Sequence, residues 1–95
     1  MVKVSKVEKD IEREEGFKVI FRHSDGSDVS GTKAVKSYKK PKKMAKNSYS
    51  VSEWIEKRFK KQYPQFNVDV LNADKKKAGG NTKLAKVRDT YLPDE

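Results

Sequence analysis

The segment from Gly16 to His23, GFKVIFRH, constrains the fold of this chain most strongly. Its side chains alternate between an apolar set and a mixed set, Phe17, Val19 and Phe21 against Lys18, Ile20 and Arg22. A period of two is typical of a β-strand with one buried face. The Asp25-Gly26 step that follows favours a tight turn, because glycine adopts positive φ without steric cost. We therefore expect a strand at 17–22 and a short partner strand at about 28–30, forming a hairpin near 17–30.

The pattern with the clearest boundaries predicts a helix at about 51–63. Ser50 stands three residues before Glu53, which is the spacing of a capping box, and Pro64 ends the segment. The apolar residues of this segment fall at helical spacing and are expected in the core: Val51, Trp54, Ile55 and Phe59. The opposite face is basic.

Three further elements follow from weaker patterns. Residues 66–71 alternate like residues 17–22 and predict a second strand. Leu84, Val87 and Tyr91 share one helical face behind an Asn81 cap, so a helix is expected at about 82–91, with a strand as the competing interpretation. Residues 2–9 suggest a short or bulged strand, and residues 9–16 suggest a connection with about one helical turn.

These elements predict an α+β fold with a small antiparallel sheet of about 3–4 strands. The helix at 51–63 and the C-terminal helix would pack on that sheet. With 95 residues the chain has the size of one domain, and its nine aromatic residues supply core area although only 34% of residues are hydrophobic. We expect a single domain at 1–92, with a flexible basic segment at about 32–48 and a tail at 93–95.

The charge of the chain is unevenly distributed. The net charge is +9. Residues 1–28 carry six basic and seven acidic side chains, a net of −1, whereas residues 29–95 carry seventeen and seven, a net of +10. No acidic residue occurs between Asp28 and Glu53. A positive field of this kind attracts phosphates and speeds encounter with them.

Three groups of residues are candidates for contact with a polyanion. The first lies in the acid-free segment, the second on the outer face of the 51–63 helix and the third in a turn: Lys33, Lys36, Tyr38, Lys39, Lys40, Lys42, Lys43 and Lys46; Lys57, Arg58, Lys60 and Lys61; Lys75, Lys76 and Lys77. Lysines neutralise phosphates, and tyrosine rings stack on unpaired bases. The competing interpretation is a solvated surface, with Tyr49 packing back on the helix start. The hypothesis gains strength if the fold places the three groups on one face.

Catalytic chemistry is not indicated by any motif. The chain has no cysteine and a single histidine, His23, which lies in the predicted turn region with Asp25 and Asp28. The glycines at 79–80 lack the spacing of a phosphate-binding loop and are expected in a loop or helix start. We expect no catalytic residue, no metal site and no cofactor.

The sequence therefore favours a non-enzymatic accessory protein that binds DNA or RNA through phosphate contacts. Lysine outnumbers arginine by nineteen to four, so little sequence specificity is expected. The alternative is an adaptor or inhibitor that docks on an acidic protein partner. The chain has no apolar run of about 20 residues and no apolar signal-peptide core, so we expect a cytoplasmic protein without membrane contact, nuclear if the source is eukaryotic. The oligomeric state is left open.

Overall fold

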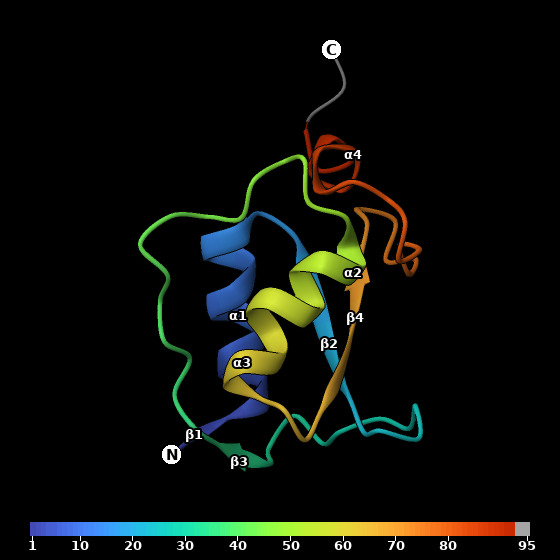
Figure 1. Cartoon of the computed structure of the whole chain (residues 1–95). Helices are drawn as coiled ribbons and strands as arrows, with labels where there is room; N and C mark the ends of the chain where they lie inside the picture. Colours follow the sequence, from blue (N-terminus) through green and yellow to red (C-terminus); the bar gives the residue numbers. More distant parts are fainter. Residues whose placement is uncertain (93–95) are drawn as a thin grey trace.

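The computed structural model describes residues 1–92, and the predicted tail at 93–95 lies outside the described residues. The chain forms an α+β fold, as predicted. Figure 1 shows the elements in chain order: β1 (Val2–Lys3), α1 (Val4–Glu15), β2 (Lys18–Arg22), β3 (Ala34–Val35), α2 (Val51–Trp54), the π-helical turn η1 (Ile55–Phe59), α3 (Lys60–Gln62), β4 (Asn67–Leu71) and α4 (Leu84–Asp89).

The prediction for the N-terminal residues was wrong. Residues 4–15, expected as part of a strand and a connection, form the longest helix of the fold. Its buried side chains recur every three or four residues, at Val4, Val7, Ile11 and Glu15. The alternation of Val2 and Val4 concealed this helical stripe, and the charged residue at its end weakened it further. Gly16 ends the helix with φ of +84°, and its N–H donates to the Glu12 carbonyl at 2.9 Å.

The two predicted strands at 17–22 and 66–71 are confirmed, and they pair with each other. β2 and β4 run antiparallel, with Val19 opposite Val70 and Phe21 opposite Val68. These four side chains are buried on the face that α2, η1 and α3 cover (Figure 1). The Phe21 ring lies 5.0 Å from the Phe59 ring, so the sheet and the helix share one aromatic core.

Of the hairpin predicted near 17–30, the first strand and the turn are present, but the second strand is not formed. The His23 N–H donates to Ser27, and Gly26 has φ of +89° as the tight turn requires. The expected partner strand at 28–30 consists of one bridge between Arg22 and Asp28. The strands consequently form two separate pairs, β1 with β3 and β2 with β4, and not one sheet of 3–4 strands.

The predicted C-terminal helix is present but shorter, and Asn81 does not cap it. α4 begins after Lys83, which makes no side-chain capping bond. The loop before α4 instead completes the start of α2, because Val51 and Ser52 donate their N–H groups to the Thr82 and Gly80 carbonyls at 2.8 and 3.0 Å. After α4, the Tyr91 hydroxyl bridges β2 and β4.

The helices within residues 1–92 are each too short or too polar to cross a lipid bilayer.

Candidate nucleic-acid interface

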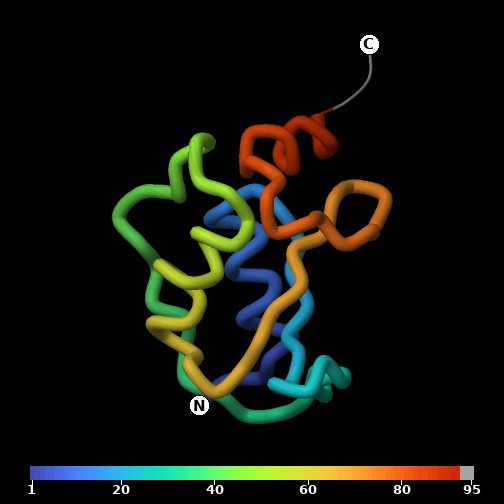
Figure 2. Tube along the Cα trace, turned by 45° about the vertical axis from the view of Figure 1, so that its right-hand side comes forward, coloured from blue at the N-terminus to red at the C-terminus, as the bar shows by residue number. Residues whose placement is uncertain are grey.

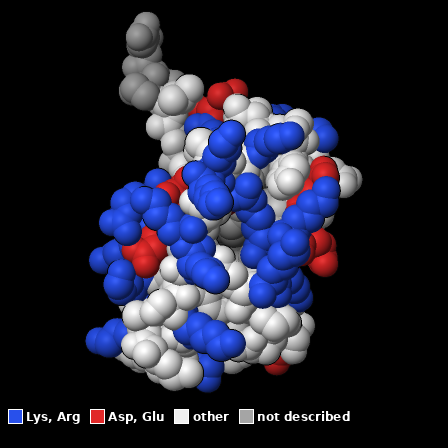
Figure 3. Space-filling view, turned by 60° about the vertical axis from the view of Figure 1, so that its left-hand side comes forward, with Lys and Arg blue, Asp and Glu red and all other residues white. Residues whose placement is uncertain are grey.

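The acid-free segment and the 51–63 helix meet at a small pocket, which we call the basic cleft. Its volume is about 280 Å³. The residues that line it come from two stretches of chain: Tyr38, Lys39, Lys40 and Pro41, and Lys57, Arg58, Lys61 and Gln62. Figure 3 shows lysine and arginine side chains crowded around a hollow on the side of the molecule that carries the 32–48 segment. The fold thus brings together two of the three predicted basic groups.

The helix presents its basic residues through a π-helical turn. Trp54 and Phe59 are both buried, although residues five apart lie well off one face of a regular α-helix. The wider turn at Ile55–Phe59 returns Phe59 to the buried side. Lys57 and Arg58 lie within this turn and line the cleft, but the Lys57 ammonium lies 3.6 Å from the Glu53 carboxylate and 5.1 Å from the centre of the Tyr49 ring.

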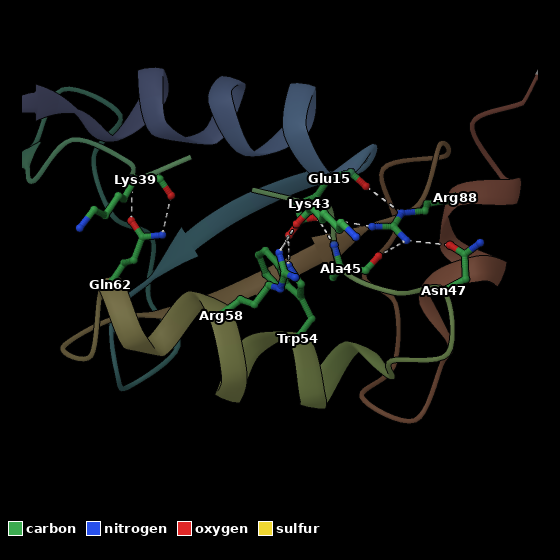
Figure 4. Close-up of polar contacts among 9 residues, drawn as sticks. All are labelled: Glu15, Lys39, Lys43, Ala45, Asn47, Trp54, Arg58, Gln62 and Arg88. Carbon is green, nitrogen blue, oxygen red and sulfur yellow. Dashed lines mark hydrogen bonds and ion pairs between the residues drawn. The ribbon is translucent and has the colours of Figure 1, made fainter. Parts of the chain in front are cut away.

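One end of the cleft is closed by two hydrogen bonds between the Gln62 side chain and the Lys39 backbone. The Lys39 N–H donates to the Gln62 side-chain oxygen at 2.7 Å, and the Gln62 amide donates back to the Lys39 carbonyl at 3.0 Å (Figure 4). Next to this pair, the Tyr63 hydroxyl donates to the Lys36 carbonyl at 2.8 Å. The chain at Lys36 and Lys39 is therefore fixed to the end of the helix before any ligand binds.

The other end of the cleft is fixed by Glu15, whose side chain has no exposed surface. Its carboxylate accepts hydrogen bonds from the Ala45 N–H at 2.7 Å and from the Trp54 indole at 2.8 Å (Figure 4). Arg58 lies 3.5 Å from the same carboxylate and donates to the Lys43 carbonyl at 2.7 Å. One buried acid from α1 thus contacts Arg58, in one wall of the cleft, and Ala45, which follows the other wall in sequence.

Arg88 extends this network to α4. It donates to the Glu15 carbonyl at 2.8 Å and, with one terminal nitrogen, to Ala45 and Asn47 at 2.7 Å each (Figure 4). Charge-assisted hydrogen bonds from Glu15, Arg58 and Arg88 therefore join residues 43–47 of the acid-free segment to α1, η1 and α4.

The cleft keeps a positive charge after its ion pairs are counted. Lys40 lies 3.5 Å from Glu14, and Lys57 lies 3.6 Å from Glu53. Both pairs have an exposed lysine, and exposed pairs bind weakly. Lys39 and Lys61 are exposed and form no ion pair with another residue of the described chain. These two ammonium groups are the ones most available to an anion.

Tyr38 forms an uncharged part of the cleft wall. It is half-buried. Burial, followed by the negative charge of Glu15, raises the pKa of its hydroxyl far above the ordinary value of 10.0. A tyrosine hydroxyl of the ordinary pKa is already neutral near pH 7, and the raised pKa keeps the Tyr38 hydroxyl neutral further into the alkaline range.

The remaining predicted residues lie outside the cleft. Lys33, Lys36, Lys42, Lys43 and Lys46 are exposed along the same segment, and Lys60 is half-buried at the start of α3.

The third predicted group, at 75–77, is not next to the first two. Its turn follows β4, and Figures 1 and 2 both place it on the opposite side of the molecule from the 32–48 segment. Lys77 pairs with Asp69 at 3.4 Å, while Lys75 and Lys76 are exposed. The condition that all three groups share one face is therefore not met: the fold brings residues of the first two groups together and separates the third.

The residues that the sequence assigned to a turn or to the core, and not to a binding site, have structural roles in the fold. Asp25 accepts hydrogen bonds from the N–H and the hydroxyl of Ser27 within the turn after β2. Trp54 and Phe59 are buried in the core. Among residues 1–92 the structure gathers no three histidine, aspartate or glutamate side chains that could hold a metal ion.

Sequence reasoning missed the residues that shape the cleft, which are Glu15, Gln62 and Arg88. A signal existed for Glu15, since it falls four residues after Ile11 on the helical stripe of α1. Gln62 and Arg88 gave none, because their contacts are formed with residues 23 and more positions away.

Comparisons with known protein families, curated proteins and solved structures found no match to this chain.

Proposed function

We propose that this protein is a non-enzymatic nucleic-acid-binding protein that contacts phosphate groups through the basic cleft. The observation that carries the proposal is the convergence of Lys39, Lys40, Lys57, Arg58 and Lys61 on one pocket from two distant stretches of sequence. Clustered cations bind phosphates by displacing the counterions that surround a nucleic acid. A merely solvated lysine run would not need to be fixed to the helix.

The cleft favours contact with the backbone over recognition of sequence. Both polar atoms of the Gln62 side chain are bonded to the Lys39 backbone, so this amide is not free to bind a base edge. Arg58 is held by Lys43 and Glu15, which restricts bidentate contact with guanine. The other cations are lysines, which act as point charges. Little sequence specificity follows.

A titration of labelled oligonucleotides at several salt concentrations tests this function. Affinity should fall steeply with salt, with a log–log slope of about −0.7 to −0.9 for each phosphate neutralised. Oligonucleotides of different sequence and equal length should give similar affinities. Absence of binding at about 50 mM salt would exclude the proposal, since nonspecific electrostatic binding is strongest at low salt.

A second candidate is an adaptor that docks on an acidic protein by strand addition. It is favoured by the two-stranded β2–β4 pair, because the outer edges of its strands are covered over part of their length only, by the bridges Arg22–Asp28 and Leu71–Lys77. Recovery of the protein's partners from lysate, with and without nuclease, separates the candidates. A protein partner that is retained after nuclease supports the adaptor, whereas loss of all partners supports nucleic-acid binding.

A further inference from the structure

The shape of the basic cleft narrows the class of nucleic acid. We infer that the cleft takes a single unpaired nucleotide of a DNA or RNA strand, with its base against Tyr38 and its flanking phosphates on the lysines of the two walls. This inference rests on the proposed function and goes beyond it, because phosphate contact alone does not distinguish a single strand from a duplex.

The size of the cleft is the first argument. A volume of about 280 Å³ lies just below the range of about 300–1,000 Å³ that small-molecule sites occupy. Such a pocket has room for a group of roughly nucleotide size and not for a helical segment. Bases in a duplex are stacked and paired inside the helix, whereas an unpaired base can turn into a pocket.

The composition of the walls is the second argument. Tyr38 and Pro41, which carry rings, line the pocket together with Lys57 and Lys61, whose stems are aliphatic. Tyr38 is only partly buried where it packs against the hydrophobic core. Aromatic rings stack on any base, and lysines beside them hold the backbone, which is the usual arrangement in proteins that bind single strands. The neutral Tyr38 hydroxyl does not repel the strand.

The rigidity of the cleft is the third argument. The residues on either side of Tyr38 and Pro41 are fixed by Gln62, Arg58 and Tyr63 through backbone contacts of 2.7–3.0 Å. The pocket is therefore formed before the ligand arrives, and binding does not have to order the segment.

The experiment compares a single strand with its duplex. Fluorescence anisotropy is measured with an oligonucleotide of about 12 nucleotides, prepared as DNA and as RNA, alone and annealed to its complement. We expect at least one of the single strands to bind more tightly than its own duplex. In the variant Tyr38→Ala, affinity for that strand should fall about 5- to 150-fold, the loss expected when one stacking ring is removed. Tyr38→Phe keeps the ring and should bind like the unchanged protein.

Duplex binding of the variants serves as the control for folding. Tyr38→Ala should retain the duplex affinity of the unchanged protein, because the lysines remain. If neither single strands nor duplexes bind, the proposed function itself fails. If duplex and single strand bind equally, or if Tyr38→Ala loses no affinity for the single strand while it binds duplex normally, only the inference about the unpaired nucleotide is overturned. If Tyr38→Ala also loses duplex binding, the variant Tyr38→Phe is used in its place. If Tyr38→Phe no longer prefers the single strand over the duplex, the inference is overturned.

Discussion

Glu15 is the residue on which the candidate site depends most. Its carboxylate is fully buried and is satisfied by the Ala45 N–H, the Trp54 indole and two arginines. Within residues 1–92, each buried side-chain nitrogen and oxygen has a hydrogen-bond partner. A buried carboxylate is tolerated only when hydrogen bonds and opposite charges offset the cost of removing it from water, so the loss of one partner destabilises the fold.

Replacement of Glu15 tests this dependence. Glu15→Ala leaves the Trp54 indole and the arginines without their partner, so the free energy of unfolding should fall by about 3–5 kcal/mol. The neighbouring Glu14→Ala is the control, because its carboxylate is partly exposed and its loss should cost less than about 1 kcal/mol. Urea denaturation measures both values. A similarly small decrease in the free energy of unfolding for both variants would show that the hydrogen bonds of Glu15 do not hold the 32–48 segment in place.

The buried tyrosines make stability sensitive to alkaline pH. Burial raises the pKa of Tyr63 from 10.0 to about 12, and burial also raises the pKa of Tyr38 and Tyr91. Well below pH 10 these hydroxyls are protonated in both the folded and the unfolded state. Between about pH 10 and 12 the unfolded chain loses protons that the folded chain retains, so stability should fall as pH rises through this window.

Thermal unfolding measured at several pH values checks the alkaline effect. The variant Tyr63→Phe cannot ionise at this position, so its stability should fall less steeply over the same window. Tyr63→Phe also removes the hydrogen bond from the Tyr63 hydroxyl to the Lys36 carbonyl, so the variant should be less stable than the unchanged protein at neutral pH as well. An identical pH dependence in the two proteins would contradict the assignment to Tyr63.

At the scale of elements, the capping box of α2 sets where the basic helix begins. The Glu53 N–H donates to the Ser50 hydroxyl, and the Ser50 N–H donates to the Glu53 carboxylate, each at 3.1 Å. Ser50→Ala should lower the free energy of unfolding by about 1 kcal/mol. Ser48→Ala, at an exposed position of the preceding turn, should have little effect. Thermal or urea unfolding of the two variants checks this, and equal stability would mean that the cap contributes nothing.

Local patterns predicted the elements whose buried side chains are apolar and regularly spaced. Residues 17–22, 51–63 and 66–71 belong to this class. Residues 4–15 were missed because Glu15 occupies a core position on an otherwise apolar stripe. The π-helical turn was also beyond prediction, since Val51, Trp54, Ile55 and Phe59 together fit the spacing of a regular helix and so conceal the five-residue separation of Trp54 and Phe59.

At the scale of the whole molecule, the positions of the basic groups follow from tertiary contacts. The pairing of Phe21 with Val68 joins segments far apart in sequence, and it carries the turn at 75–77 away from the 32–48 segment. The sequence pattern predicted three lysine groups and left open whether they share one face. The fold makes a cleft from two of them and separates the third, which no local pattern could indicate.

The central claim is that the basic cleft, and not the net charge of +9, binds nucleic acid. Two double variants with the same loss of charge test it: Lys39→Gln with Lys61→Gln in the cleft, and Lys75→Gln with Lys76→Gln in the distant turn. All four side chains are exposed, and none forms an ion pair with another described residue. The measurement is the salt dependence of affinity for a single-stranded oligonucleotide.

For the cleft variant we predict that the magnitude of the log–log slope falls by about 1.4 to 1.8, because two lysines no longer neutralise phosphates, and that affinity falls clearly as well. The variant of the distant turn should keep nearly the slope of the unchanged protein. Equal losses of affinity in the two variants, or a larger loss in the distant turn, would contradict the account and assign binding to overall charge or to another surface.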